Sequence, residues 1–307
     1  MTRLSQYFTL DVLSKIAFGN AFGYLKANTD LYEYIETGQA FLPVLELLCN
    51  HAWLRPIVFS PLVQKLLAPK DADNVGMGKI LNIAHQAVDE RYAAAAPADP
   101  EKHGAQRKDM LGSFISAGLS RQEAQSESHI QILAGSDSTS TAVRMTMLYL
   151  VTNPLAYNTL RAEIDLGVAE GRIEKESTIT DAQARKLPYL QAVIWEGLRK
   201  CPPLFGLGSK VAPLPHGETV NGIFYPPGTE VGVCPAAVTH REDVFGLDAA
   251  VFRPERWTDS DETTRETMRG VVDLIFGSGR FGCLGKNIAF LELNKVFVEV
   301  RTLLITV

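Results

Sequence analysis

Cysteine is scarce in this sequence, and it lacks the spacing of a metal module. The chain has four cysteines among 307 residues, Cys49, Cys201, Cys234 and Cys283, and no two of them form a Cys-x-x-Cys pair. A disulfide-stapled secreted scaffold needs cysteines in closer sets, and a zinc module needs paired ligands. The sequence therefore predicts neither class, and we expect the thiols to be reduced.

The chain also lacks an excess of positive charge. It carries 30 Lys and Arg residues against 35 Asp and Glu, which gives a formal net charge of -5, and no dense Lys/Arg block occurs. Proteins that bind nucleic acid through the phosphate backbone usually present a basic patch. We therefore expect no nucleic-acid partner.

Long apolar runs are missing as well. No stretch approaches the roughly 18 uninterrupted apolar residues that a membrane-spanning helix needs, and the first twenty residues do not read as a signal peptide. Hydrophobic residues still make up 46% of the chain, enough to bury a large core in one big domain or two ordinary ones. We expect a globular protein whose sequence contains no span.

Hydrophobic periodicity predicts helix over most of the first 200 residues. Apolar residues recur every fourth position at Leu4, Phe8, Val12 and Ile16. Gly19 follows them and suits a helix end. A second helix is predicted over 73–96, and a long one begins at Arg121 and stops at Asn153-Pro154.

Beyond residue 200 the pattern changes from helical to extended. Residues 218–234 alternate β-branched and aromatic side chains around an Asn-Gly turn and a Pro-Pro-Gly turn, which predicts a small sheet. The sequence therefore predicts a mainly α fold with a small β region, an α+β class.

A glycine-rich loop, FGSGRFGCLGKN at 276–287, first resembles a nucleotide site. Gly277, Gly279 and Gly282 match G-x-G-x-x-G between a plausible strand at 271–276 and a helical pattern, but too little chain follows for the second strand and its acidic residue. The phosphate-binding G-x-x-x-x-G-K-[ST] also fails, because Arg280 stands at its first glycine. Neither nucleotide motif fits.

Cys283 is the other chemical feature of this loop. At the start of a helix, unpaired N–H groups and the helix dipole favour the thiolate, which can ligate iron. Gly279 and Gly285 would let the backbone pass close to a flat cofactor, with Phe276 packed nearby. The alternative is a cysteine buried in a tight loop, and the loop alone does not separate the two.

Charged residues supply further candidates for functional or structural ion pairs. Glu196 and Arg199 lie three apart on one helical face, close enough to pair, although a solvated surface pair is the common alternative. Arg256 follows Pro254 and Glu255 in the segment VFRPERW, where a second arginine could reach a shared carboxylate.

The long helix contains an abrupt polar turn. Gly135 to Thr139, sequence GSDST, are poor helix formers, so we expect the helix to bend or loosen there. A surface turn is one interpretation. Because apolar residues flank this turn on both sides, a buried break that contacts a ligand is the other.

In this order, with Cys283 last, these features resemble the cytochrome P450 haem-thiolate monooxygenases. The resemblance covers essentially the whole chain. Within that family, the stretches FTLDVLSKIAFGNAFG, FRPERW and FGSGRFGCLGKNIAF are similar to filamentous-fungal members of the pisatin-demethylase-like type.

The resemblance implies roles on the cofactor side. Cys283 would be the axial thiolate to the iron of haem b. Other cofactor contacts would be Phe276, Gly279, Arg280, Gly285 and Gly135. A buried acid–arginine network would hold the cofactor-side core, formed by Glu196, Arg199 and Arg256.

The resemblance also implies the chemistry. Asp137 and Ser138 would form the acid–alcohol pair that delivers protons for dioxygen reduction, and substrate contacts would be Ala134, Leu204 and Phe205. The activity would be hydroxylation of a small hydrophobic metabolite in fungal secondary metabolism, using O2 and electrons that NADPH–cytochrome P450 reductase supplies from NADPH.

The sequence departs from the family pattern in two residues. Phe281 stands two positions before the cysteine, where most members place an Arg or His that contacts a haem propionate, and Arg280 comes one position earlier. Ser138 replaces the commoner Thr of the acid–alcohol pair and lacks the methyl group that restricts rotation, so looser coupling of O2 reduction to product formation is expected.

The family pattern further implies that residues 1–307 form a single partial domain. By that comparison the membrane anchor and early helices would be absent at the front, and the terminal hairpin at the back. A full-length parent would lie at the endoplasmic reticulum membrane on its cytosolic face; a chain without the anchor would be cytoplasmic. The alternative function is a remnant that binds haem poorly or not at all.

Overall fold

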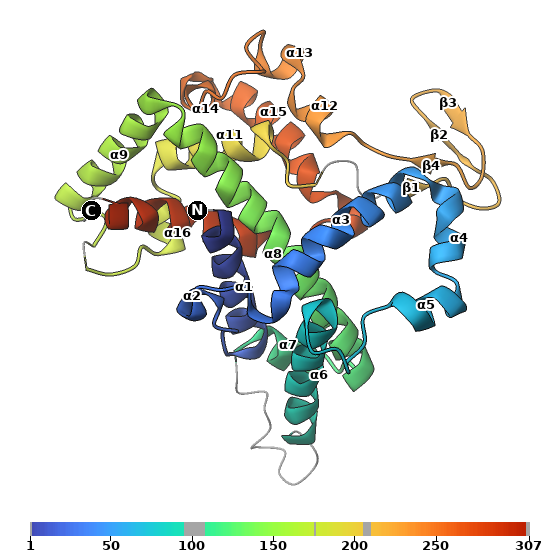
Figure 1. Ribbon diagram of the computed structural model, residues 1–307. Coiled ribbons are helices and arrows are strands. Elements are labelled where there is room, and N and C mark those ends of the chain that lie inside the picture. The colour runs from blue at the N-terminus through green and yellow to red at the C-terminus, as the bar shows by residue number, and fades with distance from the viewer. Residues whose placement is uncertain (1, 95–107, 175, 205–209, 305–307) are drawn as a thin grey trace. The chain divides into compact units, whose positions relative to one another are not determined.

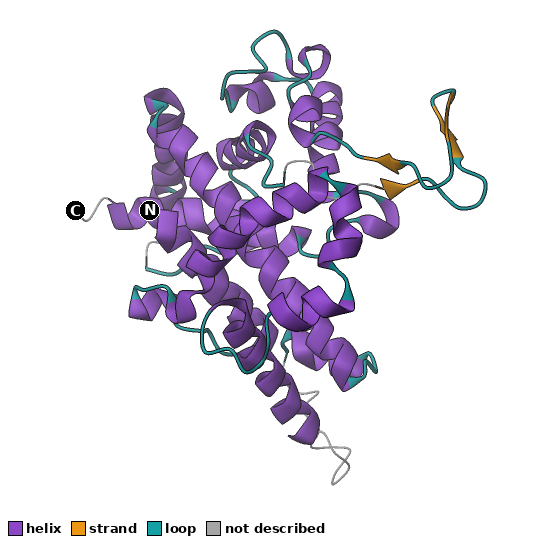
Figure 2. Ribbon diagram, turned by 45° about the vertical axis from the view of Figure 1, so that its right-hand side comes forward, coloured by secondary structure: helices purple, strands orange, loops and turns teal. Residues whose placement is uncertain are grey.

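The protein is mainly helical, and its few strands are short (Figures 1 and 2). The computed structural model describes residues 2–94, 108–174, 176–204 and 210–304. The mainly α class with a small β region is confirmed. No helix in these described ranges is long and apolar enough to cross a membrane.

The chain divides into two compact units, residues 1–137 and 138–307. Their boundary falls inside the longest helix, α8 (Arg121–Val151). The expectation of one domain over residues 1–307 stays a prediction, and each unit is described by itself.

The first unit is built from helices that enclose one hydrophobic core. Its elements before α8 are α1 (Thr2–Phe18), α2 (Tyr24–Ala27), η1 (Leu31–Glu33), α3 (Tyr34–Asn50), η2 (Ala52–Leu54), α4 (Arg55–Val58), α5 (Pro61–Leu67), α6 (Gly76–Ala94) and α7 (Met110–Ser116). Core side chains come from α1, α3, α6, α7 and α8, including Leu10, Ile80, Leu111 and Ile132.

Helix α1 forms where the periodicity predicts it and ends at the predicted glycine. The Gly19 N–H donates to the Lys15 carbonyl at 2.9 Å, and its φ of 82° is a conformation that glycine adopts without strain. The face that enters the core carries Tyr7 and Leu10 rather than Leu4, which is exposed. The periodicity therefore predicted the helix but not its buried face.

The second unit is organised around α11 (Pro188–Lys200), which buries nine of its residues. The remaining helical elements are α9 (Pro154–Ala169), α10 (Asp181–Ala184), α12 (Pro235–Thr239), α13 (Glu242–Phe245), α14 (Glu255–Asp259), α15 (Glu262–Asp273), η4 (Leu274–Phe276), η5 (Gly279–Phe281) and α16 (Lys286–Leu304). Apolar side chains of α8, α9, α11, α15 and α16 form its core.

The predicted sheet is present as two antiparallel pairs. β2 (Glu218–Val220) pairs with β3 (Ile223–Tyr225), and β1 (Lys210–Val211) pairs with β4 (Glu230–Val231). Asn221 and Gly222 both have positive φ, 50° and 79°, which suits a two-residue hairpin. These strands are the orange arrows of Figure 2.

Two local expectations are wrong. Residues 271–276 are the end of α15 followed by η4, not a strand, so the strand–loop–helix context of a dinucleotide site is absent there. The polar turn at 135–139 does not loosen the long helix, because α8 continues through it as α-helix. Buried apolar residues on both sides, Ile132 and Val143, anchor the helix and outweigh the weak propensity of the turn.

Helices α8 and α11 cross closely at one glycine of the second unit. A Cβ on Gly197 would lie 1.9 Å from the Thr146 Oγ1 atom and 2.8 Å from its Cβ. Real side chains do not approach this closely, so a glycine is required at this crossing.

We predict that Gly197→Ala destabilises the protein by about 1–3 kcal/mol, because the methyl group must push Thr146 and the two helices apart. Urea denaturation followed by circular dichroism measures the loss. The control is Gly270→Ala in α15, where a Cβ meets no atom within 4 Å and better helix propensity adds up to about 1 kcal/mol. Equal stability of the two variants would contradict the close crossing.

Candidate functional site

Helix α11 is held at its N-terminus by a carboxylate from a neighbouring helix. Pro188 opens α11, and the Glu163 carboxylate of α9 accepts hydrogen bonds from the N–H groups of Tyr189 at 2.8 Å and Leu190 at 2.9 Å. The first N–H groups of a helix have no partner within it, and its dipole favours a negative charge there. Glu163 therefore fixes the helix that carries the predicted acid–arginine pair.

Glu196 and Arg199 form a two-pronged ion pair inside α11. The Arg199 Nε donates to Glu196 Oε2 at 2.8 Å, and its Nη2 donates to Oε1 at 2.7 Å. Both side chains have 0% exposure. A buried charge must be paired and hydrogen-bonded to be tolerated. The structure thus excludes the solvated surface pair.

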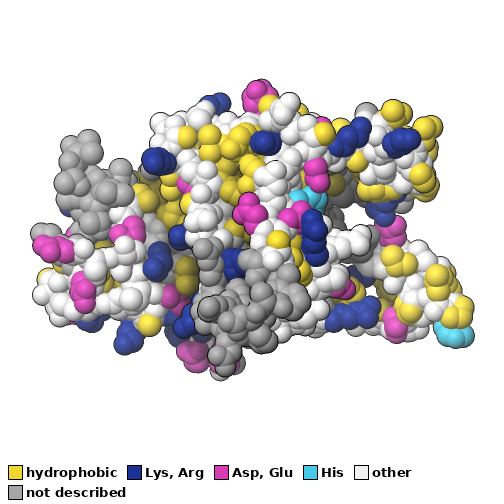
Figure 3. Space-filling view, turned by 90° about the horizontal axis from the view of Figure 1, so that it is seen from below, with side chains coloured by type: hydrophobic (Ala, Val, Ile, Leu, Met, Phe, Trp, Pro, Cys, Tyr) yellow, Lys and Arg dark blue, Asp and Glu magenta, His cyan; other side chains and the backbone are white. Residues whose placement is uncertain are grey.

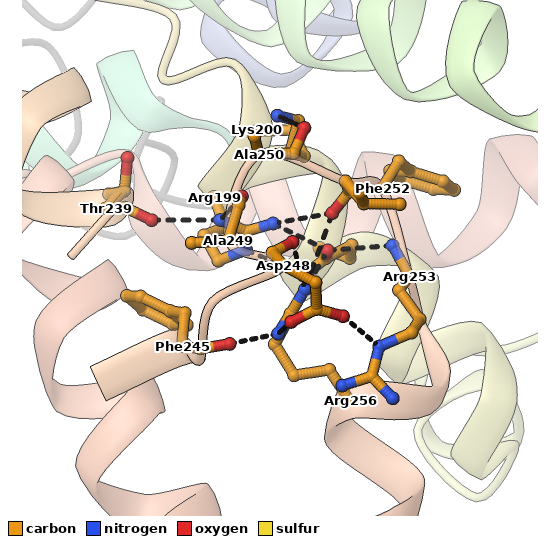
Figure 4. A network of polar contacts seen from close by, with 12 residues as sticks. Arg199, Lys200, Thr239, Phe245, Asp248, Ala249, Ala250, Phe252, Arg253 and Arg256 are labelled. Atoms are coloured by element: carbon orange, nitrogen blue, oxygen red, sulfur yellow. Dashed lines mark hydrogen bonds and ion pairs between the residues drawn. The ribbon is translucent and has the colours of Figure 1, made fainter. Parts of the chain in front are cut away.

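Arg199 also binds three backbone carbonyls of two distant segments (Figure 4). Its Nη1 donates to the carbonyls of Thr239 at 3.0 Å and Ala249 at 2.8 Å, and its Nη2 donates to that of Val251 at 3.1 Å. These bonds satisfy the guanidinium and fasten α12 and residues 249–251 to α11.

Both carboxylate oxygens of Glu196 also accept hydrogen bonds from residues other than Arg199. Its Oε2 accepts from the Trp257 Nε1 at 2.9 Å, and its Oε1 accepts from the Arg253 N–H at 2.9 Å. The Arg256 Nε lies 3.6 Å from Oε1, and the Arg256 Nη1 donates to Asp248 Oδ1 at 2.7 Å. The structure therefore brings Glu196, Arg199 and Arg256 together in one buried network.

Three members of this network were missed by sequence reasoning. Trp257 and Arg253 lie within the VFRPERW segment, so the motif that pointed to Arg256 contained their signal. No sequence signal pointed to Asp248, because it lies outside that segment and contacts Arg256 only in the folded structure. The hydrogen bond from Arg256 lowers the pKa of the Asp248 carboxyl.

A row of aromatic rings, tilted relative to one another, connects this network to the cysteine loop. Ring centroids lie 5.9 Å apart for Trp257 and Trp195, 5.1 Å for Trp195 and Phe290, and 5.6 Å for Phe290 and Phe276. Such separations are favourable for aromatic pairs. The row supports the loop from α11, α14 and α16, and Phe276 is its last member.

The cysteine loop is closed by its own backbone. The Cys283 N–H donates to the Phe276 carbonyl at 2.6 Å. Gly277 has φ 75°, and a Cβ there would lie 2.6 Å from the Phe281 carbonyl oxygen, so only glycine fits. Gly279 has φ 57° and open space around its Cβ position.

The Cys283 thiol is free and exposed just before α16. The pocket beside it has a volume of about 370 Å³. It is lined by Gly270, Asp273, Leu274, Phe276, Gly277, Ser278, Gly279, Gly282, Cys283 and Lys286. This exposure excludes the alternative of a cysteine packed into the protein. A Cβ on Gly285 would lie 3.8 Å from the Cys283 Sγ, an ordinary contact distance.

Positive charge surrounds the aromatic residue two positions before the cysteine. Phe281 is exposed, with the Lys210 Nζ 3.5 Å and the Arg280 Cζ 4.6 Å from its ring centroid. Cations over an aromatic face are attracted to it. Lys210 comes from β1, so sequence reasoning had no signal that would place it here.

The loop's donor set fits a haem held by one protein ligand. Cys283 offers an accessible sulfur, glycines leave its surroundings open, and Lys210 and Arg280 supply positive charge for carboxylates. Within the described ranges, no group of three or more His, Cys, Asp and Glu residues could hold a bare metal ion. A planar cofactor that needs one thiolate matches these donors.

The acid–alcohol candidates lie on α8 at the unit boundary. Asp137 is the last residue of the first unit and Ser138 the first of the second. Both are partly buried, and the Asp137 Oδ1 accepts a hydrogen bond from the Gln6 side chain of α1. Their catalytic role stays a prediction.

The remaining residues that the resemblance assigned to cofactor or substrate contacts lie in different environments. A Cβ on Gly135 would lie 3.0 Å from a Leu13 methyl of α1, so this glycine permits close packing of α1 on α8. Ala134 and Leu204 are exposed. Phe205 lies outside the described residues. Their roles as cofactor and substrate contacts stay predictions.

A buried carboxyl in α16 was not singled out by sequence. Glu292 is 2% exposed, and its Oε2 has no hydrogen-bond partner among the described residues. Burial raises its pKa to about 8, because a carboxylate loses its hydration inside the protein.

We predict that Glu196→Gln lowers the free energy of unfolding by about 3–5 kcal/mol, because Arg199 would remain buried without its counter-charge. Urea denaturation measures the loss. The matched control is Glu170→Gln, whose carboxylate pairs with Arg172 at 2.6 Å on the surface and should cost under about 1 kcal/mol. Similar losses in both variants would refute a buried network.

We predict that Glu292 makes the folded protein less stable as pH rises. Between its unfolded pKa of 4.5 and the folded value of about 8, the folded state keeps a proton that the unfolded state releases. Stability should fall by roughly 3–5 kcal/mol over this window. Urea midpoints at pH 5 and 9 should change much less in Glu292→Gln, whereas the exposed control Glu266→Gln should behave as the parent. An unchanged slope in Glu292→Gln would disprove the assignment.

Comparison with known proteins identifies the family. The model of a family described as Cytochrome P450 matches residues 1–300. The "Cytochrome P450 monooxygenase ABA1" of Pyricularia oryzae is 43% identical over 299 residues, which are 97% of this chain and 56% of that protein. The "Pisatin demethylase" of Fusarium vanettenii is 30% identical over 313 residues, covering 98% of this chain and 56% of that protein.

A solved structure shares the fold. The "Crystal structure of cytochrome P450DA heme domain" aligns with a TM-score of 0.70 at 18% identity, over 98% of this chain and 60% of that one. This confirms that the structure corresponds to part of a cytochrome P450 fold. The chain spans about half the length of the curated relatives that it matches, 56% for the two named above. With the family match extending over nearly all of its residues, the chain belongs to the cytochrome P450 family.

Proposed function

We propose that this chain supplies the thiolate side of the haem site of a monooxygenase. The observation that carries the proposal is the free, exposed thiol of Cys283, presented by a backbone-closed glycine loop beside a pocket of about 370 Å³. Family membership supports it, and so do fungal relatives whose names contain the word monooxygenase.

Residues around the loop would hold haem b. Cys283 would ligate the iron, Phe276 would pack beside the cofactor, and Gly279 and Gly285 would leave room for it. Arg280 and Lys210 would neutralise its propionates in place of the Arg or His expected at position 281. When bound, haem supplies the oxidising chemistry that a C–H bond requires, and the thiolate pushes electron density toward it.

Other residues of the chain would deliver protons and contact the substrate. Asp137 and Ser138 would form the proton-delivering pair, with the Asp137 carboxyl positioned by Gln6. Ala134, Leu204 and Phe205 would contact a small hydrophobic metabolite of fungal secondary metabolism, which would be hydroxylated with O2. Electrons would come from NADPH through NADPH–cytochrome P450 reductase. A longer parent would work at the cytosolic face of the endoplasmic reticulum.

The test is the spectrum of the reduced, carbon monoxide-treated protein after residues 1–307 are mixed with haem. We expect a far red-shifted Soret band, because a thiolate ligand donates electron density to the iron. Cys283→Ser should abolish this band. Cys234→Ser, which alters another exposed and free cysteine, should retain it.

Two outcomes would contradict the proposal for this chain. One is the absence of haem uptake, and the other is an identical band in Cys283→Ser. Either result would favour the alternative of a haem-poor remnant.

A further inference from the structure

Two histidine rings lie against each other between helices of the first unit. His85 of α6 and His129 of α8 have ring centroids 4.3 Å apart, at an interplanar angle of 40°. Both side chains are partly buried. Two imidazoles that bind one Zn²⁺ ion through Zn–N bonds of about 2.0–2.1 Å have ring centroids about 4–5 Å apart. The two rings are therefore spaced as a pair of metal ligands would be.

The hydrogen bonds of the two rings leave one nitrogen of each for a further partner. The His85 Nδ1 lies 2.8 Å from the Asp71 Oδ2, and the His129 ring is hydrogen-bonded to the backbone of Leu81. The His129 Nε2 is buried and has no hydrogen-bond partner among the described residues. A histidine that binds a metal commonly donates its other N–H to a carboxylate or a backbone carbonyl. Both rings have that arrangement.

The unpartnered Nε2 of His129 needs a physical explanation. Buried polar atoms of folded proteins nearly always have a partner, and a bound ion or water is one that a protein chain does not supply itself. Burial and the neighbouring His85 lower the pKa of His129, so its ring is neutral near pH 7. Because the bond to Leu81 uses the other nitrogen, Nε2 carries a lone pair. A neutral imidazole nitrogen can bind a metal, whereas a protonated one cannot.

The neighbouring turns of α6 and α8 hold the two histidines in register. Asp89 lies one turn after His85. It accepts hydrogen bonds from the Arg121 and Gln125 side chains of α8, the latter at 2.7 Å. Gln125 in turn lies one turn before His129. The two ligands are thus positioned before an ion binds, which lowers the cost of ordering them.

An ion can reach the pair from solvent on the side of His85. The His85 side chain is 21% exposed, and that of Asp71 is 59% exposed. Helix α6 lies at the lower end of the first unit in Figure 1, and Figure 3 shows the molecule from below, with acidic and basic side chains interspersed. A cation would therefore meet no broad positive field on that face.

We propose that His85 and His129 chelate a divalent transition-metal ion of the Zn²⁺ type through their Nε2 atoms, with Asp71 orienting the His85 ring. Imidazole nitrogen suits Zn²⁺, whereas Mg²⁺ and Ca²⁺ prefer oxygen ligands. Among the described residues, no group of three His, Cys, Asp or Glu side chains could hold a metal ion, so water would complete the coordination of this pair. The bound ion would link α6 to α8, and the inference is independent of haem binding.

The experiment titrates the full chain with Zn²⁺ by calorimetry in a background of Cys234→Ser and Cys283→Ser, which removes two exposed thiols. We expect one ion to bind at this site, and binding at least tenfold weaker in His85→Ala and in His129→Ala. Asp71→Asn should weaken binding about tenfold, the lower end of the effect of removing a carboxylate that orients a ligand. An excess of Mg²⁺ should not compete.

Matched variants separate this pair from other histidines. His51→Ala, in the same unit, and His216→Ala, at another exposed histidine, should bind Zn²⁺ as the parent does. Zn²⁺ should raise the thermal unfolding midpoint of the parent, because it binds the folded state, and should raise that of His129→Ala much less. Circular dichroism checks that each variant is folded. If His129→Ala does not fold, His85→Gln, at the more accessible ring, gives the same comparison.

Three results would overturn the inference. The first is no binding of Zn²⁺, and the second is binding that His85→Ala and His129→Ala leave unchanged; either would assign the buried Nε2 atom to water. The third is an equal loss of binding in His51→Ala, which would indicate nonspecific binding to surface histidines. Since haem plays no part in these assays, failure here is distinguishable from failure of the proposed monooxygenase function.

Discussion

The buried pair of Glu196 and Arg199 is the constraint on which the second unit depends. A charge without water is tolerated only when every lone pair and N–H group finds a partner. Meeting this demand recruits the carbonyls of α12 and residues 249–251, the N–H of Arg253 and the indole of Trp257. Segments up to 61 residues apart in sequence are thereby fixed to one helix.

The cysteine loop is supported by this buried ion-pair network, although none of the network's charged residues belongs to the loop. The aromatic row from Trp257 to Phe276 carries support from α11 and α14 to the loop. Within the loop, positive φ at Gly277 and Gly279 and the bond from the Cys283 N–H to the Phe276 carbonyl set the backbone. The backbone that carries Cys283 is thus held by hydrogen bonds and glycine turns, while the space around its thiol stays open. A ligand to a large planar cofactor needs this arrangement.

Both units bury an ion pair, Arg91 with Asp109 in the first and Arg199 with Glu196 in the second. The second unit also buries a carboxyl without a charged partner, that of Glu292. Hydrogen bonds and opposite charge offset the cost of burying Glu196 and Arg199, but they do not offset the cost of burying Glu292. The first unit also leaves large apolar side chains exposed outside its core, among them Trp53, Leu62 and Leu66.

The sequence by itself determined local structure and family. Periodicity and Gly19 specified α1, Asn221-Gly222 specified a hairpin, and the ordered motifs specified cytochrome P450, because backbone preferences and motif spacing are encoded locally. Only the tertiary structure decided burial and long-range partners. It made Glu196 and Arg199 interior, left Cys283 accessible, brought Lys210 to Phe281, and kept α8 helical through its polar turn. Each of these depends on contacts between distant residues, whose energies exceed the local propensities that a sequence pattern records.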